Sequence, residues 1–231
     1  MDVRTIELKK TILEDNDRDA DLLRQQLRDE GTYYLNVMSS PGSGKTTTLI
    51  RTIRTLQDMA AGQQKESLRI GVMEADIDSD VDARTIIEET GVPAVQLHTG
   101  GMCHLDADMS RQGLAELGAK DLDLVFLENV GNLVCPAEFD TGAVKSVVIL
   151  SVPEGDDKPL KYPLMFQEVD AVLVNKIDAA PVFDFDEERF RKNLQTCNAD
   201  APVFFLSAAT GEGAQQWCGW LDEQVRNFLG R

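Results

Sequence analysis

Short runs of consecutive apolar residues alternate along the chain with segments in which apolar residues recur every three or four positions. Continuous apolar runs between turn residues are typical of strands buried on both faces, whereas the longer period indicates helices with one buried side. The pattern predicts strands over residues 33–39, 67–75, 93–97, 122–128, 144–152, 171–177 and 202–207. It predicts helices over residues 45–60, 80–90, 106–117, 186–196 and 213–229.

The first thirty residues form a highly charged segment that is also predicted to be helical. Its apolar residues recur at roughly helical spacing: Ile6, Leu8, Ile12, Leu13, Leu22, Leu23 and Leu27. Gly31 follows as a helix stop. The helix either packs on its own domain, which we favour, or serves as a helix for a partner.

Strands separated by helices predict a mostly parallel sheet covered by helices on both faces. No internal repeat, low-complexity segment or linker interrupts the pattern. We therefore expect an N-terminal helical segment, residues 1–30, and one three-layer α/β domain, residues 31–231. In such a fold the loops at the carboxyl ends of the strands carry the site.

The charge of the chain limits the classes of partner that it is expected to bind. There are 40 acidic and 23 basic residues, which gives a formal net charge of −17. This balance argues against non-specific binding to nucleic acid or to anionic membranes. No secretory signal or membrane-spanning stretch is visible, and the four cysteines show no CxxC spacing. A reduced, cytoplasmic protein is expected.

A glycine-rich segment follows the first predicted strand and matches the phosphate-binding pattern GxxxxGK[ST], except that Ser39 replaces the first glycine. Its expected nucleotide-binding residues are Ser40, Pro41, Gly42, Ser43, Gly44, Lys45, Thr46 and Thr47. Backbone N–H groups and the helix that starts near Lys45 would surround the phosphates. Lys45 would contact the β- and γ-phosphates, and the Thr46 hydroxyl would bind Mg²⁺.

A second motif, Asn175-Lys176-Ile177-Asp178, follows the predicted strand at 171–177 and matches the guanine-specificity pattern NKxD. The Asp178 carboxylate can accept hydrogen bonds from N1–H and the 2-amino group of guanine, which adenine does not offer. A carboxylate facing adenine would lose those partners. Ser207 and Ala208 follow the next strand and resemble the last guanine-contacting loop of GTPases.

Magnesium needs oxygen ligands in addition to Thr46 and the nucleotide. Asp76 and Glu128 stand at the ends of predicted strands, where either could hold Mg²⁺ or orient the attacking water. We therefore assign catalytic roles to Lys45, Thr46, Asp76 and Glu128. Three neighbouring acids, Asp78, Asp80 and Asp82, have a simpler interpretation as the solvated start of a helix. We favour this interpretation for Asp80 and Asp82.

Cys103, His104 and Cys135 form a candidate transition-metal site. Thiolate and imidazole ligands suit zinc, nickel or copper(I), and both loops are expected at the same edge of the sheet. Three ligands leave a tetrahedral site open, so a dimer sharing the metal could supply more. The alternative is two buried thiols and a histidine that opens a helix. Cys197 and Cys218 are interpreted as packing residues.

Five segments occur in one order: SSPGSGKTT, GGMCHLDA, ENVGNLVCPAEFD, SVPEGDDKPLKYP and NKID. Together, over roughly residues 30–215, they resemble the HypB family of nickel-incorporation GTPases, which mature [NiFe] hydrogenase. The resemblance implies a SIMIBI-class P-loop NTPase fold and slow GTP hydrolysis with magnesium. It also implies nickel or zinc on Cys103, His104 and Cys135.

The resemblance further implies a homodimer, a small metal-binding partner called HypA, and the hydrogenase large-subunit precursor as recipient. Two features of some members are absent: the first cysteine is Cys103, and there is no histidine-rich stretch. The alternative is an accessory GTPase of urease or of cobalamin enzymes, whose own thiols handle no metal. The urease GTPases use a Cys-Pro-His triplet, whereas Ala137 follows Cys135-Pro136 here.

Overall fold

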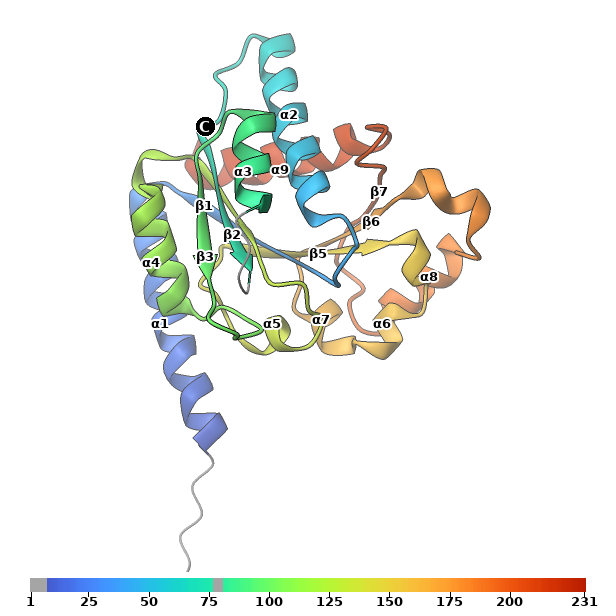
Figure 1. Ribbon diagram of the computed structural model, residues 1–231, viewed down its shortest axis with the longest axis horizontal. Coiled ribbons are helices and arrows are strands. Elements are labelled where there is room, and N and C mark those ends of the chain that lie inside the picture. Colours follow the sequence, from blue (N-terminus) through green and yellow to red (C-terminus); the bar gives the residue numbers. More distant parts are fainter. Residues whose placement is uncertain (1–7, 77–80) are drawn as a thin grey trace, which may run out of the picture.

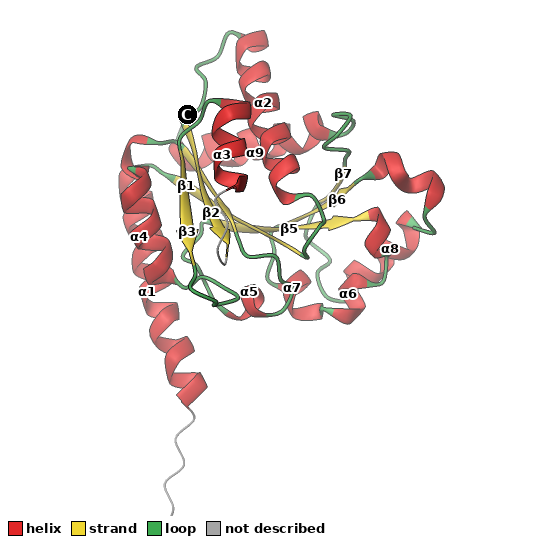
Figure 2. Cartoon of the chain, in the orientation of Figure 1, coloured by secondary structure: helices red, strands yellow, loops and turns green. Residues whose placement is uncertain are grey.

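The computed structural model describes residues 8–76 and 81–231. Within this part of the chain all the strands lie in one parallel sheet, which runs between two layers of helices (Figure 2). The strands are β1 (Tyr33–Ser39), β2 (Ile70–Asp76), β3 (Ala94–His98), β4 (Leu124–Glu128), β5 (Lys145–Ser151), β6 (Ala171–Asn175) and β7 (Val203–Phe205). Their order is β3-β2-β4-β1-β5-β6-β7. The predicted mostly parallel sheet is confirmed.

Strand β1 lies in the middle, between β4 and β5, and this placement creates the site. Val37 of β1 is in register with Glu128 of β4, and Ser39 is in register with Ile149 of β5. After β1 the chain forms β2, β3 and β4 on one side of this strand, and it then forms β5, β6 and β7 on the other side. A crevice therefore opens at the carboxyl end of β1, where α/β sheets bind ligands.

The longer helices match the predicted positions to within a few residues. They are α1 (Leu8–Glu30), α2 (Lys45–Gln63), α3 (Val81–Thr90), α4 (Ala107–Leu117), α8 (Glu187–Gln195) and α9 (Ala214–Leu229). Three short α-helices and three 3₁₀ turns were not predicted. These are α5 (Cys135–Glu138), α6 (Lys158–Lys161), α7 (Pro163–Gln167), η1 (Ala119–Asp121), η2 (Val152–Glu154) and η3 (Ile177–Val182).

Alternate residues of the sheet face different helices, as the two-residue period of a strand requires. Leu35 and Val37 of β1 lie in an apolar cluster with α2, α3 and α9. Tyr34 points to the opposite face, where it clusters with Leu23 and Leu27 of α1 and with α4. Figure 1 shows α1 and α4 side by side on that face, with α7 and α8 beyond them.

Helix α9 is joined to α2 by a buried polar contact as well as by packing. The indole Nε1 of Trp217 donates to the Thr52 hydroxyl at 3.0 Å. Trp220 stacks on Trp217, with ring centroids 5.5 Å apart. Because α2 begins at Lys45, this contact ties the helix that follows the phosphate loop to the C-terminal helix.

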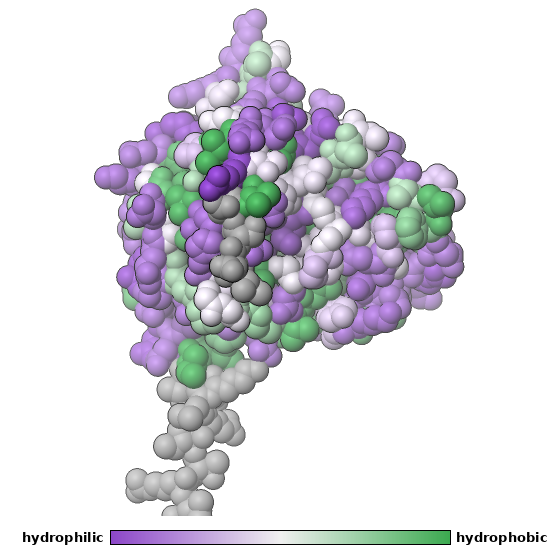
Figure 3. All heavy atoms as spheres, viewed as in Figure 1, coloured by the Kyte–Doolittle hydropathy of each residue, from purple (hydrophilic) through white to green (hydrophobic). Residues whose placement is uncertain are grey.

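The helices and one face of the molecule show how apolar residues are distributed in the described part of the chain. The described helices include none that combines the length and the apolar character needed to cross a bilayer. The face seen in Figure 3 is mainly hydrophilic, with separated apolar patches.

The amino-terminal edge of the sheet, opposite the crevice, is fastened by one buried carboxylate. Asp123 precedes β4 and is 3% exposed. It accepts hydrogen bonds from the backbone N–H and the guanidinium of Arg69, which precedes β2, and pairs with Arg231 at 2.6 Å. Burial alone would raise the pKa of Asp123, but the hydrogen bonds and charges of both arginines outweigh it and hold this pKa below its ordinary value of 3.8.

Replacing Asp123 with asparagine should therefore destabilise the fold at neutral pH by about 1–3 kcal/mol. A depressed pKa contributes stability above the unfolded value and loses it as the pH falls through the folded value. The difference between wild type and Asp123→Asn should shrink below pH 3.8. Urea unfolding of both proteins at several pH values measures this difference in the free energy of unfolding. A difference that stays constant with pH would contradict this account.

Candidate functional site

The phosphate loop links the end of β1 to α2 in the crevice. Gly42 and Gly44 have φ of 76° and 94°, a region that residues with a side chain rarely adopt, so their presence lets the loop turn back on itself. Ser43 donates its hydroxyl to the Ser40 carbonyl at 3.1 Å. Ser39, which replaces the usual glycine, is fully buried and donates to the same carbonyl at 2.7 Å. The serine is therefore accommodated inside the turn.

Glu154 supports this loop from β5 and was not identified in the sequence. One carboxylate oxygen accepts from the N–H and the hydroxyl of Ser151, at 2.7 Å each, in a capping box on η2. The other oxygen accepts from the Ser40 hydroxyl. The capping pattern is visible in the sequence, but its contact with the phosphate loop depends on β1 and β5 being neighbours.

Asn175 connects the guanine-specificity motif to the phosphate loop. Its Nδ2 donates to the Ser43 carbonyl at 2.9 Å, and its Oδ1 accepts from the N–H of Ala208 at 3.0 Å. The residue is 2% exposed. One buried amide thus fixes three predicted nucleotide-binding segments relative to one another, namely the loops after β1, β6 and β7.

The rest of the motif lies beside this bridge. Lys176 has φ of 64° and donates its Nζ to the Gly42 carbonyl at 2.7 Å. Asp178 is solvent-exposed at the start of η3, where a ligand can reach its carboxylate. Ser207 is fully buried, and its hydroxyl accepts from the N–H of Thr210 at 3.1 Å. Lys176 and Asp178 therefore flank an open position, while Ser207 shapes the loop behind it.

A cluster of carboxylates lies at the ends of β2 and β4. Glu128 accepts from the Thr46 hydroxyl at 2.7 Å. Carboxylate oxygens of Glu74, Asp82 and Glu128 lie within 4.8 Å of one another. Glu74 was missed in the sequence because it falls inside an apolar strand. Asp82 lies in the first turn of α3, as interpreted from the sequence, and the fold also brings it to the cluster.

The predicted ligand Asp76 ends β2 and is half-buried, whereas Asp78 and Asp80 lie outside the described residues. Burial raises the pKa of Glu74 to about 8 and that of Glu128 to about 7; Lys45 and Thr46 oppose the latter shift. One buried oxygen of Glu74 and one of Glu128 have no hydrogen-bond partner among the described residues. Buried, unpartnered carboxylate oxygens beside Thr46 fit a divalent cation.

The two predicted thiol ligands come together although their segments are far apart in the sequence. Cys135 is the first residue of α5, and interaction with its thiol, ahead of burial, raises the pKa of the Cys103 thiol. His104 Nδ1 lies 3.8 Å from Cys103 Sγ. All three side chains are half-buried. Thiol and imidazole donors suit zinc or nickel, but in this structure the three donor atoms do not all lie within 4.8 Å of one another, so the segments must shift to bind one ion together.

The sequence had suggested that His104 begins a helix, but in the structure it lies before α4. Helix α4 begins at Ala107, because Asp106 serves as its N-cap and accepts from the N–H of Met109 at 2.8 Å. The His104 ring stacks on Phe139 with centroids 3.7 Å apart. Burial lowers the pKa of His104, which favours the neutral imidazole that binds metals. Cys218 is buried and Cys197 half-buried, consistent with packing roles.

One short loop joins the carboxylate cluster to the thiols. It starts at Glu128, which contacts Thr46, and ends at Cys135. A Cβ on Gly131 would lie 3.2 Å from Lys45 Nζ and 3.3 Å from Pro41 Cα. The loop therefore touches the phosphate loop midway between the two candidate sites.

Replacing Gly44 with alanine should abolish nucleotide binding while leaving the fold intact. Its φ is +94°, and a Cβ would lie 2.6 Å from Asn175 Nδ2, so the bridge to the guanine motif must break. Gly91→Ala is the matched control, since φ is +73° there but the added Cβ meets nothing within 4 Å. Gly91→Ala should lose about 1 kcal/mol of stability, and Gly44→Ala should lose more, because the displaced Asn175 leaves buried polar groups without their partners. Titration with a fluorescent guanine nucleotide should show lost binding for Gly44→Ala only; equal affinities would contradict the assignment.

Comparisons with known proteins identify similar sequences. The sequence profile described as CobW/HypB/UreG, nucleotide-binding domain, matches residues 34–205. Hydrogenase maturation factor HypB of Azotobacter vinelandii is 46% identical over 96% of this chain and 70% of its own length. Hydrogenase/urease maturation factor HypB of Helicobacter pylori (strain 26695) is 38% identical over 96% of this chain and 89% of its own length.

The fold agrees as well. The crystal structure of HypB from Helicobacter pylori in complex with nickel superposes with a TM-score of 0.83 at 38% identity, covering 92% of this chain and 96% of that one. The sequence profile and both relatives match most of the chain, and the superposed crystal structure covers most of it as well. The chain therefore belongs to the CobW/HypB/UreG family of nucleotide-binding proteins, and within it to the HypB hydrogenase maturation factors.

Proposed function

We propose that this protein is a GTP-hydrolysing metallochaperone that binds nickel, or zinc, and assists insertion of nickel into the [NiFe]-hydrogenase large subunit. The observation that carries the proposal is the loop from Glu128 to Cys135, which begins at the predicted magnesium ligand and ends at a predicted nickel ligand. The names of the relatives support the maturation role, and the nickel complex of the Helicobacter pylori protein supports the cargo.

Guanine selection is assigned to Asp178 and Lys176. The exposed Asp178 carboxylate would accept the N1–H and 2-amino hydrogens of guanine, and the Lys176 stem would lie along the base. Asn175 would act indirectly, because its hydrogen bonds to Ser43 and Ala208 keep the base and phosphate subsites at a fixed separation.

Hydrolysis would proceed by in-line attack of water on the γ-phosphorus, with cleavage of its bond to the β–γ bridging oxygen and release of GDP and phosphate. Lys45 would neutralise charge on the β- and γ-phosphates. Thr46, Asp76 and Glu128 would hold Mg²⁺, which when bound supplies further positive charge to the phosphates. No arginine finger is assigned to the γ-phosphate, so we expect slow intrinsic turnover.

The cargo site is assigned to Cys103, His104 and Cys135. Their donor atoms come from two segments, so a change in the position of either segment changes the ligand set. Glu128 would respond to the nucleotide, and its loop ends at Cys135. Nucleotide state and metal affinity would therefore be coupled, and linkage requires each ligand to alter the affinity of the other by the same factor.

We also propose that the protein works as a homodimer in the cytoplasm, where free thiols persist. A small metal-binding partner, HypA, and the hydrogenase large-subunit precursor would exchange the metal with it. A urease-directed role is the second candidate, because the name of the Helicobacter pylori relative includes urease. Ala137 after Cys135-Pro136 argues against it, since it departs from the triplet of the urease GTPases.

Nucleotide choice tests the assignment of Asp178. The wild type should hydrolyse GTP and not ATP. Asp178→Asn should lose about 10-fold or more in GTP affinity, because the amide cannot accept both guanine hydrogens. The variant should gain affinity for xanthosine triphosphate, whose C2 carbonyl can accept from the new amide. A variant with unchanged GTP preference would remove Asp178 from the base site.

A nickel titration of the protein loaded with a GTP analogue tests the cargo site. Saturable binding in the wild type should be lost in Cys135→Ser and retained in Cys197→Ser, a half-buried thiol outside the site. Light scattering on the same samples gives the number of chains per ion. Equal weak binding in all three proteins would mean that only the acidic surface binds nickel, and the metal assignment would fall.

A further inference from the structure

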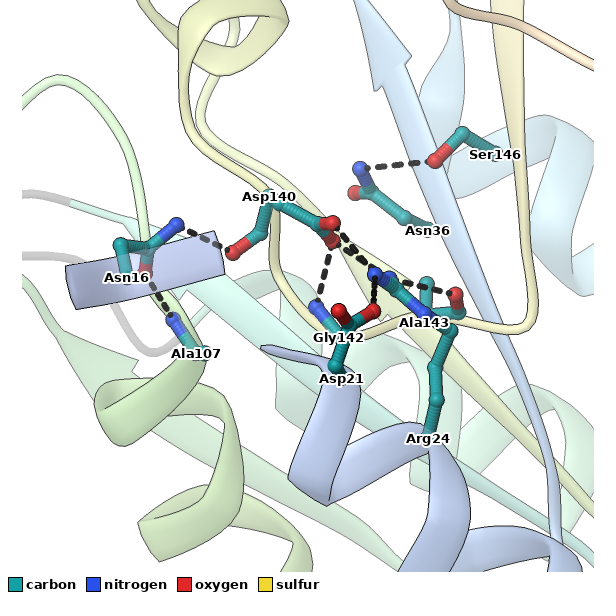
Figure 4. A network of polar contacts seen from close by, with 9 residues as sticks. All are labelled: Asn16, Asp21, Arg24, Asn36, Ala107, Asp140, Gly142, Ala143 and Ser146. Atoms are coloured by element: carbon teal, nitrogen blue, oxygen red, sulfur yellow. Dashed lines mark hydrogen bonds and ion pairs between the residues drawn. The ribbon is translucent and has the colours of Figure 1, made fainter. Parts of the chain in front are cut away.

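Asn16 on α1 lies between the two segments that carry the candidate metal ligands. Its Nδ2 donates to the carbonyl of Asp140 at 2.9 Å, and its Oδ1 accepts from the N–H of Ala107 at 2.9 Å (Figure 4). Asp140 follows α5, which begins at Cys135, and Ala107 is the first residue of α4, just after His104. The amide is 8% exposed, so it contacts both segments away from solvent.

Arg24, further along α1, holds the same loop at a second point. Its guanidinium makes a bidentate pair with the Asp140 carboxylate, at 2.8 and 2.7 Å. The carboxylate also accepts from the N–H of Gly142 at 2.8 Å. Figure 4 shows Asn16 and Arg24 approaching Asp140 at its two ends, the main-chain carbonyl and the side chain. The loop after α5 is thus fastened to α1 twice.

These polar anchors lie beside a pocket that borders the loop. This open pocket of about 670 Å³ is lined by residues 136–141, by α1 through Asp17 and Arg24, and by Asn36 and Ser146 at the sheet. Close packing normally fixes a loop of this kind, and here much of one side is open. The stack of His104 on Phe139 also joins the two ligand segments.

We infer that Asn16 is a positioning residue of the metal site, which keeps the Cys103–His104 segment and the Cys135 segment close to each other, so that their ligands can share one ion. The inference rests on the proposed cargo function and extends it to α1. Groups that orient metal ligands without touching the metal typically contribute about 10–100-fold to affinity. Asn16 would act on the relative placement of two chain segments rather than on one ligand.

The first test is nickel affinity. Asn16→Ala should bind nickel about 10–100-fold more weakly than the wild type. Asn16→Asp keeps the acceptor for the Ala107 N–H but loses the donor to Asp140. Its nickel affinity should therefore lie between those of the wild type and Asn16→Ala.

Asn198→Ala is the matched control. Asn198 also bridges segments, donating to the carbonyls of Phe166 and Val169 and accepting from the N–H of Ala201, but none of these hydrogen bonds involves the two segments that carry the candidate metal ligands. Asn198→Ala should lower the melting temperature at least as much as Asn16→Ala and leave nickel affinity unchanged. An equal loss of affinity in both variants would reduce the effect to general destabilisation and overturn the inference.

The second test needs no metal. Cys103 and Cys135 can form a disulfide in glutathione buffer, with oxidised glutathione as the oxidant, and the equilibrium reports the effective concentration of one thiol near the other. Peptide mapping should show this disulfide less favoured in Asn16→Ala than in the wild type, and unchanged in Asn198→Ala.

The two tests separate the inference from the proposed function. If the wild type binds no nickel at its thiols but Asn16→Ala still weakens thiol pairing, the cargo proposal fails and the positioning role stands. If Asn16→Ala leaves both nickel affinity and thiol pairing unchanged, the positioning role is wrong.

Discussion

The buried amide of Asn175 is the contact on which the nucleotide site depends. A parallel sheet brings the carboxyl ends of its strands to one edge, but the loops that follow have no ladder of their own to hold them. Asn175 satisfies two backbone groups, the Ser43 carbonyl and the Ala208 N–H, which belong to different loops. A side chain with both a donor and an acceptor can do this, whereas a carboxylate or an ammonium cannot.

The proposed metal site uses the same device on the other side of β1, where Asn16 links the segments that precede α4 and follow α5. Between the two asparagines runs the loop from Glu128 to Cys135, with Gly131 against Lys45. The two sites are therefore separated by one short loop and are each fixed to the rigid parts of the fold. This loop alone is therefore enough to connect nucleotide binding with metal binding.

The sequence predicts the sheet and the long helices because both depend on local periodicity. It does not predict α5, α6 and α7, which are too short to show a helical period. Residues of the site were recognised where a motif fixes their spacing, as in residues 39–46 and 175–178. Glu74, Glu154 and Asn16 were missed because their contacts depend on the order of strands and on the path of α1. Asp82 lies in the first turn of α3, as interpreted, and its approach to Glu74 and Glu128 depends on the fold.

The pairing of α2 with α9 has an optical consequence. Both tryptophans of the chain, Trp217 and Trp220, stack on one another in α9, and the Trp217 indole donates to Thr52 of α2. Indole emission is sensitive to hydrogen bonding and to a stacked neighbour. The tryptophan fluorescence of the protein therefore comes from a single place, the junction between the helix that follows the phosphate loop and the last helix. A shift of α2 would change the colour or intensity of that emission, without any attached label.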